Sequence, residues 1–287
     1  MIDLHTHTTA SDGTLTPAQL VAHAQERGLT AIAITDHDTV EGVGEALAAG
    51  AGCGITVIPG IEISAVHRQT TLHILGYYID WQSPDFCKSI QVLQNARTER
   101  NPAIIKKLQA LGVDISLAEV AAEAGTGQVG RPHIAQVLLQ KGAVRTARQA
   151  FDRFLKKGAA AYVDKFRYPA QEAVAHIRAA GGIPVLAHPS ILPCKTAPKL
   201  SSLLTELAGY GIMGVEAYYT DHSAKQVKLY EQLARKHGLL VTGGSDFHGS
   251  YIQGIALGTG RGSLAVPESV CEELQQAHRR LATATGE

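Results

Sequence analysis

The sequence of 287 residues is poor in cysteine, aromatic residues, net charge and long apolar runs. Its four cysteines, Cys53, Cys87, Cys194 and Cys271, are far apart and form no C-x-x-C motif, which argues against a disulfide framework or a zinc ribbon. No run of about 18 apolar residues is present, so no membrane-spanning helix is expected. The first residues show no basic segment followed by an apolar stretch, so we expect no signal peptide and a cytoplasmic protein.

Aromatic residues make up 5% of the chain, which leaves no stacking platform of the kind that single-strand binders use. No sequence-reading nucleic-acid motif is present, so we expect no sequence-specific DNA binding. Any RNA substrate would be short or held at its end. The hydrophobic share of 45% is enough for a large core in one domain, or in one domain with an insertion.

Short apolar segments alternate with helical patterns over most of the chain. The segments 31–35, 56–64, 72–78, 183–187, 213–217 and 239–243, together with the first residues, make seven candidate core strands. This alternation predicts a parallel sheet covered by helices. Nearly every strand end carries a histidine or an acid, as at the functional end of a closed barrel. We therefore expect a (β/α) barrel rather than an open sheet.

Residues 83–160 interrupt this alternation with helical patterns and no convincing core strand. They hold 12 Lys and Arg against six Asp and Glu, whereas the whole chain is neutral. We expect a barrel built from 1–82 and 161–287, with 83–160 as an inserted, basic helical domain. Such a domain is either an ordinary solvated surface or a cap that attracts an anionic substrate.

The ends of the predicted strands carry residues that bind metals. His5 and His7 are two apart in a strand, so their rings point the same way, and imidazole suits zinc, manganese and iron. Three or four ligands make one zinc-like site, so a larger set suffices for two or three ions. A carboxylate such as Glu62 can bridge a metal pair that clamps a phosphoryl group. The full candidate set is His5, His7, Asp12, His37, Glu62, His73, His188, Asp246 and His248.

These residues resemble the metal motifs of the polymerase and histidinol phosphatase (PHP) family, in the same order. The matching stretches are His5-x-His7, Thr35-Asp-His37, Gly60-Ile-Glu62, Ala187-His-Pro189 and Ser245-Asp-Phe-His248. The resemblance covers the whole chain. It implies a distorted seven-stranded (β/α) barrel with a centre of two to three divalent ions, usually manganese, iron or zinc.

The resemblance also implies how the ligands are shared. His5, His7, Glu62 and Asp246 would hold the first ion. Glu62 would bridge to a second ion held with His73 and His188, and Asp12, His37 and His248 would hold a third. Asp36 is expected to orient a ligating histidine or to form a turn, and Glu216 to support the site or form a salt bridge.

Within the family, the inserted domain resembles the branch of 3′,5′-nucleotide bisphosphate phosphatases and 5′-to-3′ exoribonucleases. Gly130-Arg131-Pro-His133-Ile-Ala135 is similar to the substrate-contacting stretch of that branch. Arg131 is suited to bidentate phosphate binding, and His133 to a further hydrogen bond. Lys165 and Arg167 are also candidate phosphate ligands. The alternatives are a surface Arg131, a capping His133 and a solvated pair at 165 and 167.

The sequence therefore predicts a phosphoric ester hydrolase that uses a metal-bridged hydroxide, with no protein general acid assigned. The expected substrates are nucleoside 3′,5′-bisphosphates, cut at the 3′-phosphate, and short 5′-phosphorylated RNA, cut from the 5′ end. Three alternatives remain open: a histidinol phosphate phosphatase, an amidohydrolase-type C–N hydrolase, and a metal-binding module without catalysis.

Overall fold

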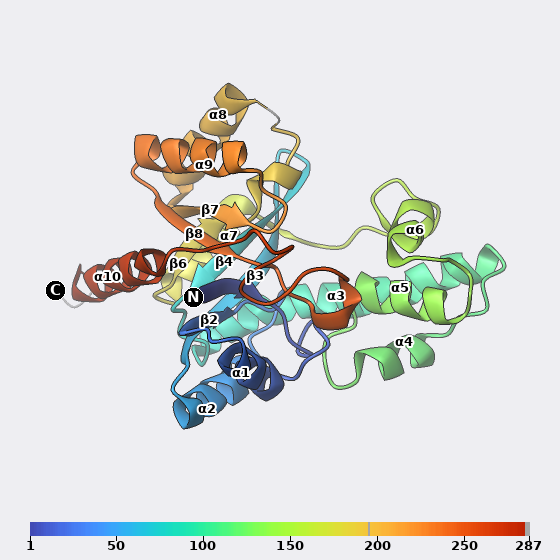
Figure 1. Ribbon diagram of the computed structural model, residues 1–287. Helices are drawn as coiled ribbons and strands as arrows, with labels where there is room; N and C mark the ends of the chain where they lie inside the picture. Colours follow the sequence, from blue (N-terminus) through green and yellow to red (C-terminus); the bar gives the residue numbers. More distant parts are fainter. Residues whose placement is uncertain (195, 285–287) are drawn as a thin grey trace.

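The computed structural model describes residues 1–194 and 196–284, and its centre is a nearly closed barrel (Figure 1). Seven strands follow one another in the order β1-β2-β3-β4-β6-β7-β8. The ends of β1 and β8 meet through two backbone hydrogen bonds of 2.9 Å, from Asp246 N–H to His5 O and from His7 N–H to Phe247 O. The distorted seven-stranded α/β barrel predicted from the sequence is thus confirmed. The strands are β1 (Ile2–Thr6), β2 (Ala31–Ile34), β3 (Thr56–His67), β4 (Thr70–Tyr77), β6 (Ile183–Leu186), β7 (Gly214–Tyr219) and β8 (Leu240–Gly244), with a short β5 (Tyr168–Pro169) beside β3.

One strand runs against the others, which corrects the expectation of a parallel sheet. β4 pairs antiparallel with both β3 and β6. Only Arg68 and Gln69 join β3 to β4, and both have a positive φ, 46° and 66°, as in the tight turn of a β-hairpin. Two residues leave no room for a crossover helix. His73 consequently lies inside β4 and not at the carboxyl end of a parallel strand.

Helices cover the outside of the barrel. Thr16 caps the first of them with a capping box, and Pro17 is its first residue. The second begins at Val43. None of the helices in the described part of the chain is long and apolar enough to cross a lipid bilayer. These helices are α1 (Pro17–Glu26), α2 (Val43–Cys53), α7 (Ala170–Ala179), α8 (Ala197–Tyr210), α9 (Ala224–His237) and α10 (Glu268–Ala284), with short 3₁₀ turns η2 (Pro189–Ile191) and η3 (Gly249–Tyr251).

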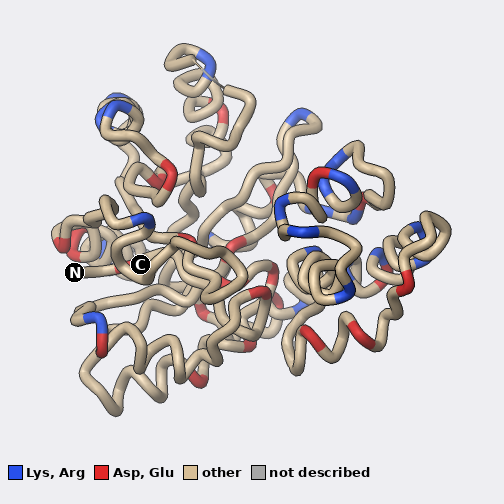
Figure 2. The backbone as a smooth tube through the Cα atoms, turned by 45° about the vertical axis from the view of Figure 1, so that its right-hand side comes forward, with Lys and Arg blue, Asp and Glu red and all other residues tan. Residues whose placement is uncertain are grey.

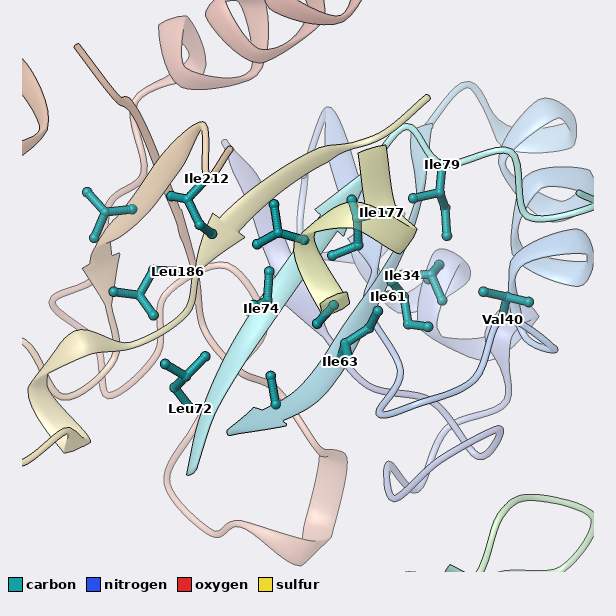
Figure 3. Packing of buried hydrophobic residues seen from close by; sticks show 14 of the residues in the cluster. Ile34, Val40, Ile61, Ile63, Leu72, Ile74, Ile79, Ile177, Leu186 and Ile212 are labelled. Carbon is teal, nitrogen blue, oxygen red and sulfur yellow. The ribbon is translucent and has the colours of Figure 1, made fainter. Parts of the chain in front are cut away.

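The two faces of the strands pack into different cores. Ile32, Ile61 and Leu186 face outward and pack with the surrounding helices (Figure 3 shows part of this layer). Ile58 and Tyr77 belong to the second core, against which α10 packs. Apolar side chains therefore fill the barrel on the α10 side. The helices of the inserted segment lie on the side of the barrel opposite to α10 (Figure 1).

The inserted segment is helical, with a core of its own. Leu108, Val120, Leu138 and Phe154 contribute to that core, whereas the first turns of α3 pack with the barrel through residues such as Leu93. Many of the Lys and Arg positions lie on this segment (Figure 2). The limits at 83 and 160 stay a prediction. The segment contains α3 (Pro84–Ala110), α4 (Leu117–Ala124), α5 (Arg131–Gln140), α6 (Ala147–Ala150) and the π-helical turn η1 (Phe151–Leu155).

Candidate metal centre and anion site

The nine candidate ligands converge at one end of the barrel, and a local irregularity in β1 helps to place two of them. The pairing of β1 with β2 shifts register between Asp3 and Thr6. Leu4 therefore belongs to the inner apolar core, and the rings of His5 and His7 also reach the polar end of the barrel. A Cβ on Gly13 would lie 2.3 Å from the carbonyl oxygen of His7. Only glycine therefore permits the tight turn that follows Asp12.

Glu62 lies at the centre of this group and is completely buried. Its Oε1 lies 2.8 Å from His73 Nδ1 and 3.0 Å from His188 Nε2. Its Oε2 lies 2.8 Å from His37 Nδ1. The same oxygen lies 3.4 Å from Nε2 of His5 in β1 and 3.4 Å from Nε2 of His7, just after that strand. One carboxylate thus faces five imidazoles, which is the arrangement expected of a bridging ligand. We call the nine residues the histidine cluster: His5, His7, Asp12, His37, Glu62, His73, His188, Asp246 and His248.

The donor atoms fall into three overlapping groups in which all of them lie within 4.8 Å of one another. The first matches the set expected for the first ion. The second contains His37 where His188 was expected, and His188 lies outside it but faces the same Glu62 oxygen, Oε1, as His73 does. The third adds His7 to the expected three ligands. The groups are His5, His7, Glu62 and Asp246; His37, Glu62 and His73; and His7, Asp12, His37 and His248.

Burial and charge set the protonation of this cluster. Burial alone would raise the pKa of Glu62, but the rings of His37 and His73 hold that pKa well below its usual value. Burial lowers the pKa of His7 to about 3, with help from His248 and His37. Among the described residues, buried atoms that include Nε2 of His5 and His7 and Oε2 of Glu62 have no hydrogen-bond partner. Unpartnered buried donors of this chemistry fit divalent cations.

Two further acids support the cluster from behind. Glu216 Oε2 accepts a hydrogen bond from the backbone N–H of His188 at 2.7 Å, and its Oε1 lies 2.9 Å from His5 Nδ1. Of the two roles expected for Glu216, these contacts favour support of the site. Asp36 differs from its expected role of orienting a histidine. Its carboxylate accepts hydrogen bonds from the backbone and hydroxyl of Thr8, both 2.7 Å, and from the Ser11 hydroxyl. It therefore holds the loop that precedes Asp12.

A second cluster, of cations, lies beside the first. Arg97 and Arg100 are 8% and 5% exposed, although α3 is a helix of the inserted segment. Burial lowers the pKa of Arg100 to about 9, and the nearby positive charges of Arg97, Arg131 and Arg167 contribute to this shift. Lys165 is also buried. We call these five residues the arginine cluster: Arg97, Arg100, Arg131, Lys165 and Arg167.

One carboxylate anchors part of the arginine cluster. Asp38 Oδ2 accepts from Arg97 Nε at 2.9 Å, from Arg97 Nη2 at 2.6 Å and from Lys165 Nζ at 3.1 Å. Its Oδ1 accepts the backbone N–H of Ser64 at 2.7 Å. Asp38 follows His37 directly, so the same turn reaches both clusters. No role of Asp38, Arg97 or Arg100 was predicted from the sequence.

The four predicted phosphate ligands are not equivalent. Arg131 donates to the carbonyl of Leu155 at 3.0 Å, and its guanidinium lies about 6 Å from two aromatic rings. Arg167 pairs with Asp164. His133 accepts the backbone N–H of Gly130 at 2.9 Å, which is the capping role that the sequence left as its alternative.

The arginine and histidine clusters meet at Gly130. A Cβ at this position would lie 3.8 Å from Asp12 Oδ2 and 3.9 Å from Arg97 Nη1. Gly130, just before α5, therefore borders an acid of one cluster and a cation of the other. An anion with two negative groups can contact both clusters at once.

The PHP domain model matches residues 3–175. The chain belongs to the PHP family. It is 34% identical to the 5′-3′ exoribonuclease of Haemophilus influenzae, with 86% of this chain and 89% of that protein aligned. It is 32% identical to the 3′,5′-nucleoside bisphosphate phosphatase of Chromobacterium violaceum, over 86% and 87% of the two chains. The PHP resemblance inferred from the sequence motifs is confirmed.

A solved structure agrees with these relatives. A Bifidobacterium adolescentis protein that is called a metal-dependent phosphoesterase superposes with a TM-score of 0.85 at 29% identity, over 95% of this chain and 94% of that one. This PHP protein is accordingly a phosphoric ester hydrolase. The histidine cluster supplies the donors that metal-dependent chemistry requires.

Proposed function

We propose that this PHP protein removes the 3′-phosphate of nucleoside 3′,5′-bisphosphates and, with the same geometry, the first nucleotide of short 5′-phosphorylated RNA. The observation that carries the proposal is the arginine cluster, with Arg97 and Arg100 buried, that meets the histidine cluster at Gly130. Both substrates present two phosphates on one nucleotide. One would lie at the arginine cluster and the other, which reacts, at the histidine cluster.

The histidine cluster is proposed to hold two to three divalent ions, manganese, iron or zinc, through the nine side chains named above. When bound, such ions supply an activated water and neutralise charge on the phosphoryl oxygens. Glu62 is the proposed bridging ligand because both of its oxygens face imidazole nitrogens. Glu216 would keep the Nε2 atom of His5 directed at the centre.

The arginine cluster is proposed to hold the 5′-phosphate. Arg131 and Lys165 would contact it, with Arg97 and Arg100 adding charge from α3. Buried cations are costly unless they are paired, and Asp38 pairs only with Arg97 and Lys165 among them. Arg167 pairs with Asp164. An incoming phosphate would complete the pairing of Arg100 and Arg131. Because it binds a second phosphate, the protein would bind these substrates more tightly than phosphate esters that carry only one.

Histidinol phosphate fits this arrangement less well. It carries one phosphate, which the histidine cluster would take, and an ammonium group at its other end. Five cations would then face that ammonium group, and like charges repel. A nucleotide with a 5′-phosphate meets the same surface with an opposite charge, so we favour the nucleotide.

The test is product analysis with adenosine 3′,5′-bisphosphate and the manganese-loaded protein. Release of 5′-AMP and inorganic phosphate supports the proposal, whereas 3′-AMP would mean that the wrong phosphate is removed. Arg131→Ala should raise KM for the bisphosphate at least tenfold more than for p-nitrophenyl phosphate, which lacks a second phosphate. Equal effects on the two substrates would contradict 5′-phosphate recognition.

Arg153→Ala is the matched control. Arg153 also belongs to the inserted segment, donates to a backbone carbonyl at 3.3 Å and lies over the ring of Phe154, but it is exposed. Both variants lose one guanidinium with similar contacts. A difference between them therefore reports the position of Arg131 beside the histidine cluster.

A further inference from the structure

A groove of about 560 Å³ lies between the inserted segment and the loop that follows β8. Gln136 of α5 and Phe151 of η1 line one wall. Tyr251 of η3 lines the other, together with His248. The groove is separate from the arginine cluster, because none of that cluster's five residues is among the described residues that line it.

The groove begins where the two clusters meet. His248, one of its lining residues, belongs to the histidine cluster and lies 3.5 Å from Asp12 through Nε2. Phe151, another lining residue, is the ring over which the Arg131 guanidinium lies, 5.9 Å from its centroid. A chain that is held by Arg131 and reacts beside His248 therefore reaches this groove if it continues past the reacting phosphate.

The lining suits a nucleotide. Arg145 and Arg148 line it and are exposed, and no carboxylate is among the described lining residues. Arg148 has a distant partner, Asp152, at 3.7 Å between two exposed groups, which water and salt screen strongly. The rings of Phe151 and Tyr251 offer apolar surface for a base. Cations beside aromatic rings are the combination that binds single-stranded nucleic acid.

The two walls are tied to each other. The Tyr251 hydroxyl donates to Glu123 Oε1 of α4 at 2.8 Å. Its ring meets that of His133 edge to face, 5.7 Å between centroids. The loop after β8 and the inserted helices are therefore fixed relative to each other, and the groove is formed before any substrate binds.

We propose that this groove binds the second nucleotide of a 5′-phosphorylated RNA, the one that follows the reacting phosphate. The proposal rests on the proposed function. Hydrolysis breaks the bond between phosphorus and the 3′-oxygen of the first nucleotide. That oxygen takes a proton, the oxygen of water stays on phosphorus, and the shortened RNA carries the phosphate at its new 5′ end. A nucleoside 3′,5′-bisphosphate ends at the reacting phosphate and does not enter the groove.

The test compares two substrates with one double variant. Arg145→Ala with Arg148→Ala removes both groove cations. With 5′-phosphorylated triadenylate, KM should rise about tenfold at low salt, and its dependence on salt should weaken. With adenosine 3′,5′-bisphosphate, kcat and KM should stay within about twofold, because local charges act over a Debye length of about 10 Å.

A control double variant, Lys225→Ala with Arg280→Ala, removes the same charge from exposed positions on α9 and α10. Both KM values should stay at the wild-type level. A thermal melt of each double variant checks that the fold is intact.

The outcomes separate this inference from the proposed function. If the wild-type protein cuts the bisphosphate but not the trinucleotide, the groove proposal falls and the phosphatase stands. An unchanged KM for the trinucleotide in the groove variant, or an equal rise for both substrates, also overturns it. The equal rise would place the first nucleotide in the groove. Failure with both substrates removes the proposed function and the groove assignment with it.

Discussion

Glu216 on β7 lies 2.9 Å from His5 on β1, between Oε1 and Nδ1, and both side chains are fully buried. The other oxygen of Glu216 is fixed by the backbone N–H of His188. The carboxylate therefore keeps the proton of His5 on Nδ1. The Nε2 atom then faces Glu62 and Asp246, each 3.4 Å away, and would be the atom that binds an ion. Carboxylates in this position orient metal-binding histidines and raise their basicity.

Glu216→Gln should consequently weaken metal binding about 10- to 100-fold, since the amide orients His5 less strictly and carries no charge. Titration of the metal-free protein with Mn²⁺ measures the change in Kd. Glu231→Gln is the control, because Glu231 also accepts a short hydrogen bond, from Tyr218, but belongs to α9. Equal affinities in the Glu216 variant and the wild type would contradict the supporting role.

Metal removal should destabilise the fold. Without ions, buried atoms such as Glu62 Oε2 and His7 Nε2 lose the partners that their burial requires. At 100 times Kd, an ion contributes about 2.7 kcal/mol, or roughly 5–10 °C in Tm for a chain of this size. Thermal melts with EDTA and then with excess Mn²⁺ measure this shift. In Glu62→Ala the shift should disappear, and a shift of wild-type size there would refute the bridging role.

The affinity for a 5′-phosphate should fall above about pH 8. Burial and the charge of Arg97, against the opposing charge of Asp38, lower the pKa of Lys165 to about 8. Raising the pH through 8 removes the Lys165 proton and with it one cation facing the phosphate. KM for the bisphosphate should therefore rise about tenfold between pH 7 and 9, the effect of one charge-assisted contact.

Lys165→Arg keeps its charge over this range, so its KM should stay flat between pH 7 and 9. p-Nitrophenyl phosphate provides the second control, because it shares any titration at the histidine cluster but does not use Lys165. If both substrates show the same pH profile in the wild type, the titrating group is not Lys165.

The histidine cluster could be located from the sequence because strand periodicity places its members. His5 and His7 share a two-residue spacing, as do Asp246 and His248, and both pairs follow apolar strands. The direction of β4 was not predictable in the same way, because Arg68-Gln69 lacks the Asn-Gly signal of a tight hairpin turn. His73 nevertheless lies 2.8 Å from Glu62, since β3 and β4 are paired over their length.

The arginine cluster was harder to foresee. Arg97 and Arg100 belong to a helix of 27 residues, where a single arginine usually indicates a solvated face. A signal was present, however: both continue the buried stripe that runs from Leu93 to Ile104. Arg97 is paired in the buried site with Asp38, which is far away in the sequence. Helical periodicity predicts which side of the helix a residue lies on, but it does not predict which other part of the protein packs against that side.

The two arginines of α3 should respond to substitution in opposite directions. Arg100 is buried, and its Nη2 and Nε donate to the Oδ1 of its neighbour Asn101 at 2.7 and 3.2 Å. No carboxylate pairs with it among the described residues, and burial with the charges of Arg97 and Arg131 lowers its pKa to about 9. Arg100→Met removes this uncompensated charge. We expect the free energy of unfolding to rise by about 1–3 kcal/mol at pH 7, as when buried ions are replaced by apolar groups.

Arg97→Met should instead cost about 3–5 kcal/mol, because Asp38 would stay buried after losing its two hydrogen bonds from this guanidinium. Urea unfolding of the two variants measures both changes. Each variant should also raise KM for adenosine 3′,5′-bisphosphate, because each removes a cation from the arginine cluster. Arg100 would then be retained for binding at the expense of stability. If Arg100→Met destabilises the protein as Arg97→Met does, Arg100 is structural and the arginine cluster has no unpaired cation waiting for a phosphate.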